Sequence, residues 1–221
     1  MYNVLFQCPF TLICSGATQS GKTTFVYNLL QNKNILFSKK PSRTFLFYKK
    51  YQKIYEQMLK YKLVDELIHV EDEMISEKDF EKKVGPYSKE SSLCIFDDLM
   101  EDISDSNSKI FTKIAHHDNC SIIFLTQILF VDNKHYRVMS RNASYFVAMK
   151  NPRDVLSIKK FASQIGMDQN FLLSSYSEAT KKAYSYLLMD FHPTTPEHIR
   201  LRSDIFPHEM PVKVYMQKNC I

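Results

Sequence analysis

The most constraining feature of this sequence is a short segment that contains two of the chain's only four glycines. Residues 16–23 read GATQSGKT and match the pattern GxxxxGK[ST]. An apolar run precedes the segment at residues 10–15, and residues 22–31 follow it with apolar side chains at helical spacing. A strand, a glycine-bounded loop and a helix in this order predict a loop that wraps a phosphate group.

Each residue type in this loop has a physical reason. Gly16 and Gly21 lack a Cβ atom, so the backbone can approach a phosphate closely and adopt unusual dihedral angles. Backbone N–H groups then point at the phosphate, and the helix N-terminus adds its positive dipole end. We expect Lys22 to bridge the β- and γ-phosphates, Thr23 to bind Mg²⁺ and Thr24 to touch the α-phosphate. The expected nucleotide-binding set is Gly16, Ala17, Thr18, Gln19, Ser20, Gly21, Lys22, Thr23 and Thr24.

A second apolar run, residues 92–96, ends in two adjacent acids, Asp97 and Asp98. A strand of this kind, parallel to the strand before the phosphate loop, delivers its first acid to the Mg²⁺ shell, usually through a water molecule. The next position is where many ATPases carry a Glu as the general base, and Asp98 is a shorter carboxylate that can serve the same role. The alternative interpretation is that both acids cap a turn before Leu99.

A third apolar run, residues 121–126, ends next to the amide of Gln127. In one large division of P-loop ATPases, an extra strand lies between the phosphate-loop strand and the acid-bearing strand. A polar residue at its tip senses the γ-phosphate or orients the attacking water, and an amide can donate to one and accept from the other. The alternative is a Gln127 that binds only nearby backbone.

Three arginines follow this run: Arg137, Arg141 and Arg153. An arginine that reaches the γ-phosphate held by a neighbouring subunit would stabilise charge in the transition state. We choose Arg141 for this role, and a surface or structural role is the alternative.

Apolar strands alternate with amphipathic helices along the chain, which predicts an α/β fold. The expected architecture is a P-loop NTPase with a mostly parallel sheet, helices on both faces, and an extra strand between the phosphate-loop strand and the Asp97 strand. We expect one domain over residues 1–221, in which strands at about 184–203 extend the sheet and 208–221 form a tail. A helix is also expected over residues 108–117.

Composition narrows the functional classes. The net charge of +5 permits a nucleic-acid partner without demanding one. The 16 Phe and 13 Tyr exclude disorder along the whole chain. No apolar run reaches the length of a transmembrane helix, and the N-terminus lacks the features of a signal peptide. Five cysteines without a CxxC pair favour buried, reduced thiols and therefore an intracellular protein.

Five blocks carry a family resemblance: GATQSGKTTF, LCIFDDLM, SKIFTKIAHHDNCSIIFLTQILF, SRNASYFVAMKNPRD and YSYLLMDF. In this order they resemble viral genome-packaging ATPases of the FtsK–HerA superfamily, most of all those of Polinton/Maverick elements, adintoviruses and related double-jelly-roll viruses. The likeness runs over about residues 9–207. It implies ATP and Mg²⁺ as cofactors, a homo-oligomeric ring, and movement of double-stranded DNA into a preformed capsid. Asp98 stands where the superfamily usually has Glu.

The sequence therefore predicts a subunit of a DNA-packaging motor that contacts capsid or portal-vertex proteins and no membrane. We expect it in the host nucleus or at a cytoplasmic assembly site, and transiently on the virion. Residues 129–142 are expected to form a loop that shifts against DNA, with its cationic and aromatic side chains at Lys134, His135, Tyr136, Arg137 and Arg141. A plain surface loop is the alternative there. Two other functions stay open: a non-hydrolysing, nucleotide-gated adaptor and a small P-loop kinase.

Overall fold

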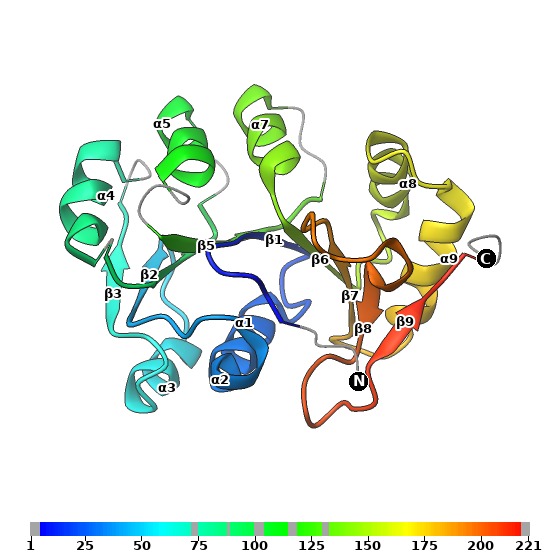
Figure 1. The fold of residues 1–221 in the computed structure, drawn as a ribbon, viewed down its shortest axis with the longest axis horizontal. Helices are drawn as coiled ribbons and strands as arrows, with labels where there is room; N and C mark the ends of the chain where they lie inside the picture. Colours follow the sequence, from blue (N-terminus) through cyan, green and yellow to red (C-terminus); the bar gives the residue numbers. More distant parts are fainter. Residues whose placement is uncertain are drawn as a thin grey trace.

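A mixed β-sheet runs across the molecule (Figure 1). The computed structural model describes residues 5–71, 75–87, 89–99, 104–114, 119–129 and 133–217. Within these ranges the strands lie in the order β3-β2-β4-β5-β1-β6-β7-β8-β9. Their bounds are β1 Thr11–Ser15, β2 Arg43–Tyr48, β3 Glu66–His69, β4 Ser92–Asp97, β5 Cys120–Thr126, β6 Tyr145–Met149, β7 Tyr186–Asp190, β8 Leu201–Ser203 and β9 Lys213–Tyr215.

The six strands from β3 to β6 pair in parallel, and β7, β8 and β9 continue the sheet in antiparallel fashion. Strand β5 lies between β1 and β4, so the predicted extra strand between the phosphate-loop strand and the Asp97 strand is confirmed. Its register pairs Thr126 with Ser15 and Leu125 with Asp97. The carboxyl ends of these parallel strands therefore meet at one edge of the sheet.

Helices cover both faces of the sheet, as predicted (Figure 1). On one face lie α1 (Lys22–Gln31), α2 (Lys33–Leu36) and α3 (Ile54–Lys60). On the other lie α4 (Glu77–Val84), α5 (Asp105–Lys109), α7 (Lys134–Asn142), α8 (Val155–Gln164) and α9 (Gln169–Ala179), with a π-helical turn at Ile110–Ile114. Short 3₁₀ helices occupy Gly85–Tyr87 and Glu197–Ile199.

Alternate residues of each central strand pack into two separate cores, one on each face. Along β4, Leu93 and Ile95 pack with α1 and α3, whereas Cys94 and Phe96 pack with α4 and the other helices of the opposite face. All four side chains are almost completely buried. A strand covered on both faces reads in the sequence as an uninterrupted apolar run, which is why the parallel strands could be recognised.

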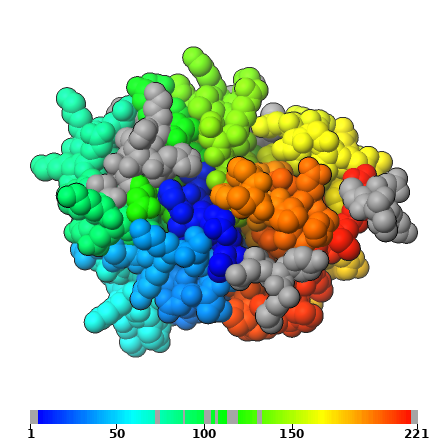
Figure 2. Space-filling model, in the orientation of Figure 1, coloured from blue at the N-terminus to red at the C-terminus, as the bar shows by residue number. Residues whose placement is uncertain are grey.

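Figure 2 shows the side of the molecule at which the parallel strands begin. The N-terminal segment (blue) lies there beside the segment between β7 and β8 (orange). Two contacts to Tyr145, at the start of β6, agree with this view: the backbone N–H of Gln7 donates to its hydroxyl at 3.0 Å, and His192 stacks on its ring. The opposite edge, where the parallel strands end, carries the phosphate loop.

The prediction of a loop over residues 129–142 is wrong, because α7 occupies Lys134–Asn142. The side chain of Asn133 caps this helix by accepting from the backbone N–H groups of His135 and Tyr136, at 2.8 and 3.1 Å. Tyr136 and Met139 lie one turn apart and are buried. A helix forms here because its start is capped and it has an apolar stripe to bury, although most of its residues are polar.

Two further expectations change. The expected tail at 208–221 contains β9, which pairs with β8. In the expected helix at 108–117, α5 begins earlier, at Asp105, and passes into the π-helical turn, while residues 115–118 lie outside the described part of the chain. In the described residues, none of the helices combines the length and apolar character needed to cross a bilayer.

Candidate active site

The phosphate loop packs so tightly that its first glycine has no room for a side chain. A Cβ atom on Gly16 would lie 2.5 Å from Ser20 Oγ and 2.6 Å from Met149 Cβ. Gly21, the residue before α1, has a φ of +100°, a conformation that side-chain-bearing residues avoid. The backbone N–H of Gly16 donates to Thr126 at the end of β5, at 3.1 Å. Gly16 is therefore required by its close packing and Gly21 by its backbone conformation, as the sequence motif implies.

Lys22 folds back over this loop. Its Nζ donates to the carbonyl oxygens of Gly16, at 2.7 Å, and Ala17, at 3.1 Å. Burial lowers the pKa of the Lys22 ammonium, and the negative charges of Asp97 and Asp98 partly oppose this. The cationic group therefore lies directly above the loop in which a phosphate would sit.

Asp97, the last residue of β4, is only 3% exposed and receives three hydrogen bonds on one oxygen. Its Oδ2 accepts from Tyr55 Oη at 2.8 Å, from Thr23 Oγ1 at 3.1 Å and from Gln52 Nε2 at 3.1 Å. Burial raises the pKa of Asp97, although the bonds from Tyr55 and Thr23 and the charge of Lys22 act in the other direction. A buried carboxylate beside a threonine hydroxyl is a set of hard oxygen ligands that suits Mg²⁺.

Asp98 and Gln127 meet at the same edge. Gln127 Nε2 donates to Asp98 Oδ1 at 3.0 Å, and both side chains are exposed. Gln127 directly follows β5 and Asp98 directly follows β4, so the pairing of these strands brings them together. Asp98 has a φ of +60°, which turns the chain sharply after Asp97 and separates the environments of the two carboxylates. One is buried beside Thr23 and the other faces solvent.

These residues line a cleft of about 680 Å³. One wall is the phosphate loop and the start of α1, and another is formed by Asp97, Asp98 and Gln127. A carboxylate in solvent, a buried carboxylate, a lysine and the N-terminus of α1 converge there. Such an arrangement can bind a polyphosphate and a divalent cation and can activate water beside them.

The sequence profile of the Poxvirus A32 protein family matches residues 1–177 of this 221-residue chain. The chain belongs to the poxvirus A32 protein family. No curated protein resembles this A32-family chain closely enough in sequence to count as a relative.

Solved structures agree on the fold. The genome packaging NTPase B204 from Sulfolobus turreted icosahedral virus 2, in complex with ATPγS, superposes with a TM-score of 0.52 at 13% identity, over 93% of this chain and 96% of that one. The cytoplasmic domain of the type VII secretion ATPase EccC from Thermomonospora curvata gives a TM-score of 0.52 at 14% identity. That match covers 84% of this chain and 24% of the EccC chain. Both likenesses show a P-loop NTPase fold.

The A32-family site contains residues that the sequence analysis did not identify. Gln52 and Tyr55 contact Asp97, and Lys50, Tyr51 and Tyr184 line the cleft. Residues 50–55 are close to the site because β2 pairs with β4, and this pairing sets Tyr48 at the end of β2 beside Asp97. The polar run KKYQ directly after a buried strand was the available signal, but only the strand order places it at the Mg²⁺ acid.

Arg141 is not part of this cleft. It lies in the last turn of α7, next to Asn142, whose carbonyl accepts from Thr11 Oγ1 at the beginning of β1. That is the edge of the sheet opposite to the phosphate loop. Arg137 and Arg153 do not line the cleft either. A role for Arg141 in the site of a neighbouring subunit stays a prediction.

Proposed function

We propose that this chain is an ATP-hydrolysing subunit of a motor that moves double-stranded DNA into a viral capsid. The observation that carries the proposal is the convergence of Lys22, Asp97 and the Asp98–Gln127 pair on one cleft. Membership of the A32 family and the likeness in fold to the packaging NTPase B204 favour genome packaging over other work done by P-loop ATPases. The finer grouping with Polinton/Maverick and adintovirus ATPases rests on the sequence blocks alone.

In the proposed reaction, the phosphate loop holds the β-phosphate of ATP and Lys22 bridges the β- and γ-phosphates. Thr23 and Asp97 would hold Mg²⁺, which supplies positive charge beside the phosphates. Asp98 accepts a proton from a water molecule, whose oxygen forms a bond to the γ-phosphorus. The bond between this phosphorus and the β–γ bridging oxygen breaks, and ADP and inorganic phosphate are released. Gln127 positions Asp98 and reports the loss of the γ-phosphate.

The proposed DNA contact is a basic stripe on α7 instead of a loop. Lys134 and Arg137 lie three residues apart on one exposed face of the helix. Arg141 lies one turn further along the same face and is assigned to the nucleotide site of the neighbouring subunit. Tyr136 cannot take part, because it is buried and its hydroxyl donates to the carbonyl of Leu129 at 3.0 Å. Cations on one helix face suit contact with the phosphates of a duplex.

The proposed working form is a homo-oligomeric ring docked on capsid or portal-vertex proteins, at a host nuclear or cytoplasmic assembly site. In such a ring the nucleotide lies between neighbouring subunits, and Arg141 of one subunit reaches the γ-phosphate held by the next. The modest charge of +5 agrees with DNA binding that needs assembly or ATP.

The test is ATP turnover with and without double-stranded DNA, at protein concentrations high enough for assembly. We expect turnover that DNA stimulates in the wild type and that disappears in Asp98→Asn. Glu81→Gln, which neutralises an exposed acid on α4, is the matched control and should behave as wild type. Tight ATP binding with no turnover in any condition would favour the nucleotide-gated adaptor, and transfer of phosphate to a small acceptor would favour the kinase.

A further inference from the structure

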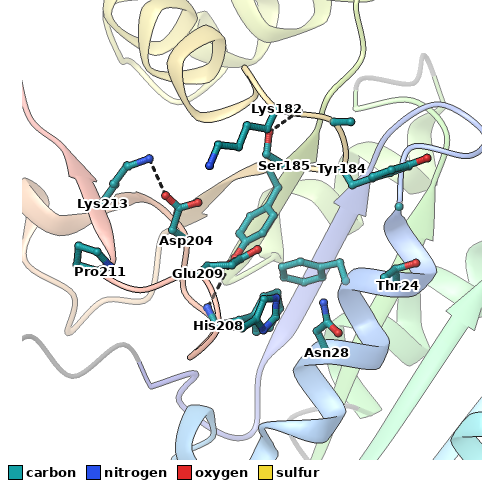
Figure 3. A pocket seen from close by; sticks show the side chains of 15 residues that line it. Thr24, Asn28, Lys182, Tyr184, Ser185, Asp204, His208, Glu209, Pro211 and Lys213 are labelled. Atoms are coloured by element: carbon teal, nitrogen blue, oxygen red, sulfur yellow. Dashed lines mark hydrogen bonds and ion pairs between the residues drawn. The ribbon is translucent and has the colours of Figure 1, made fainter.

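A second cavity, of about 460 Å³, opens beside the phosphate loop (Figure 3). It shares Gly21, Thr24 and Tyr184 with the cleft described above, so the two spaces adjoin at the start of α1. In the sheet, β5 and β4 lie on one side of β1, whereas β6, β7 and β8 lie on the other. The acids and Gln127 occupy the first side, and this cavity occupies the second. A nucleotide with its γ-phosphate toward Asp98 would direct its base to the cavity.

The floor of the cavity is aromatic and rigid. Phe25, Tyr186 and Phe206 line it and are at most 3% exposed as whole residues. Their ring centroids are 4.8 Å apart for Phe25 and Tyr186, 5.3 Å for Phe25 and Phe206, and 5.9 Å for Tyr186 and Phe206. These side chains are already ordered by packing against one another, so binding at the floor of the cavity costs them no side-chain freedom.

Tyr184 stands at the border between the two spaces. It is 68% exposed, and its φ of +62° is a left-handed conformation that is uncommon for a bulky residue. Two hydrogen bonds hold the turn. Ser185 Oγ donates to the carbonyl oxygen of Lys182 at 2.7 Å, and the backbone N–H of Lys150 donates to the carbonyl oxygen of Ser185 at 3.2 Å. The left-handed turn places the ring of Tyr184 beside Gly21, where an added Cβ atom would lie 3.3 Å from Tyr184 Cδ1. Backbone strain of this kind concentrates at ligand sites.

Polar groups face the cavity from two sides (Figure 3). Thr24 and Asn28 lie one turn apart on α1, and in the described part of the chain the Asn28 side-chain amide has no hydrogen-bond partner. Glu209 faces them from the C-terminal segment, where its Oε2 accepts from Tyr186 Oη at 2.7 Å and from the backbone N–H of Phe206 at 3.3 Å. An unpaired amide and a fixed carboxylate can bind the polar edge of a base.

We propose that this cavity is the base and ribose subsite of the nucleotide, in which Tyr184 stacks on the base and Asn28 binds its edge. The inference rests on the proposed function, since it needs a nucleotide in the phosphate loop. The ligand class is a nucleoside triphosphate, as opposed to inorganic polyphosphate.

The test compares ATP with inorganic tripolyphosphate, which fills the phosphate loop but has no base. Dissociation constants of both are measured by calorimetry with the full-length chain and Mg²⁺. For Tyr184→Gly, which removes the ring and suits the left-handed backbone, we expect roughly tenfold weaker ATP binding and unchanged tripolyphosphate binding. Asn28→Ala should act in the same direction. Tyr184→Phe keeps the ring and should bind ATP within about twofold of wild type, as estimated from stacking.

Two controls separate the inference from the proposed function. Tyr61→Ala removes an exposed tyrosine, 57% accessible, that lines neither space, and both dissociation constants should stay at their wild-type values. Lys22→Ala should weaken both ligands. If it weakens neither, the proposed function fails. If Lys22→Ala acts as expected but the Tyr184 and Asn28 variants change both ligands equally, or change neither, the base subsite is wrong.

Discussion

The side-chain amide of Gln127 donates a 3.0 Å hydrogen bond to the carboxylate of Asp98, across the ends of two neighbouring parallel strands. The bond joins the expected γ-phosphate sensor to the expected general base. Gln127 has a second polar atom, its carbonyl oxygen, which can accept a hydrogen bond from water. Loss or gain of the γ-phosphate would therefore change the position of the general base, Asp98, through the Gln127 side chain alone.

Gln127→Ala should lower the turnover number more than it raises KM. We expect a fall of roughly 10- to 100-fold in kcat, because the alanine no longer orients Asp98 or the attacking water. KM for ATP should change little, since Gln127 does not belong to the phosphate loop. Steady-state kinetics check this, with Gln164→Ala, an exposed glutamine at the end of α8, as the control. A loss confined to KM would contradict the assigned role.

Asp98→Asn should abolish turnover and leave the fold intact. The backbone at this position has a φ of +60°, and asparagine is one of the few side-chain-bearing residues that tolerate it. We expect a fall of about 10²- to 10⁴-fold in the single-turnover rate, the usual contribution of a general base. Thermal unfolding of this variant should match that of wild type. Asp98→Glu should retain part of the turnover, because it keeps a carboxylate at this position but fits the left-handed backbone less well than aspartate does.

The phosphate loop, the Mg²⁺ acid and the Asp98–Gln127 pair could be predicted because each belongs to a local pattern. A buried parallel strand reads as an apolar run. Asp97 ends one such run, and Asp98 and Gln127 each directly follow a strand of this kind. Their convergence needed one non-local assumption, the position of β5 between β4 and β1, which the family resemblance supplied.

Gln52 and Tyr55 could not be found in this way. Their contacts with Asp97 join residues 45 and 42 positions apart and depend on the pairing of β2 with β4. The base subsite has the same origin, since it joins α1 to residues around Tyr184 and Glu209. Helix α7 is a different case. Asn133 is a residue type that favours a helix start, but Tyr136 and Met139 alone give only a weak apolar periodicity. The many polar residues of 134–141 are equally typical of a surface loop.

Asp97→Asn should stabilise the nucleotide-free protein at neutral pH while removing ATP hydrolysis. Burial raises the pKa of Asp97 above the ordinary value of an aspartate, so the folded state binds its proton more tightly than the unfolded state does. The contribution of Asp97 to stability is therefore complete below the ordinary pKa of an aspartate and is lost as the pH rises through the raised pKa of the folded state. Above it, the wild type holds an unfavourable buried charge that asparagine lacks.

The expected advantage of Asp97→Asn is a higher Tm than that of the wild type at neutral pH. It should shrink as the pH falls toward the ordinary pKa of an aspartate. Thermal unfolding of both proteins across pH 4–8, without nucleotide or Mg²⁺, measures the difference in Tm at each pH. An advantage that is constant with pH would show that the charge of Asp97 is not its cause.

Gly16→Ala should weaken ATP binding, because the new methyl group would lie 2.5 Å from Ser20 Oγ and 2.6 Å from Met149 Cβ. The loop would have to open, which misdirects its N–H groups, and we expect at least about tenfold weaker binding. Gly85→Ala is a matched control, because nothing lies within 4 Å of its added Cβ and its φ is −51°. That change should leave ATP binding as it is and raise stability slightly.

Mixed assemblies can test whether Arg141 acts on a neighbouring subunit. The side chain lies at the sheet edge opposite to the phosphate loop, so within one chain it cannot touch the nucleotide. We expect Arg141→Ala alone to lose DNA-stimulated turnover, as Asp98→Asn does, while both bind ATP. When the two variants are mixed, an interface can combine the intact Asp98 of one subunit with the intact Arg141 of the other, and partial turnover should return.

The matched control for this experiment is Lys78→Ala, which removes an exposed cation on α4. When this control is mixed with Asp98→Asn, turnover should not exceed the share that the active subunits contribute to the mixture. Recovery in the Arg141→Ala mixture alone would show that the arginine is supplied in trans, because neither parent protein has a complete site. If Arg141→Ala keeps full ATP turnover but binds DNA more weakly, the arginine belongs to the basic stripe of α7 and a different cation serves the neighbouring site.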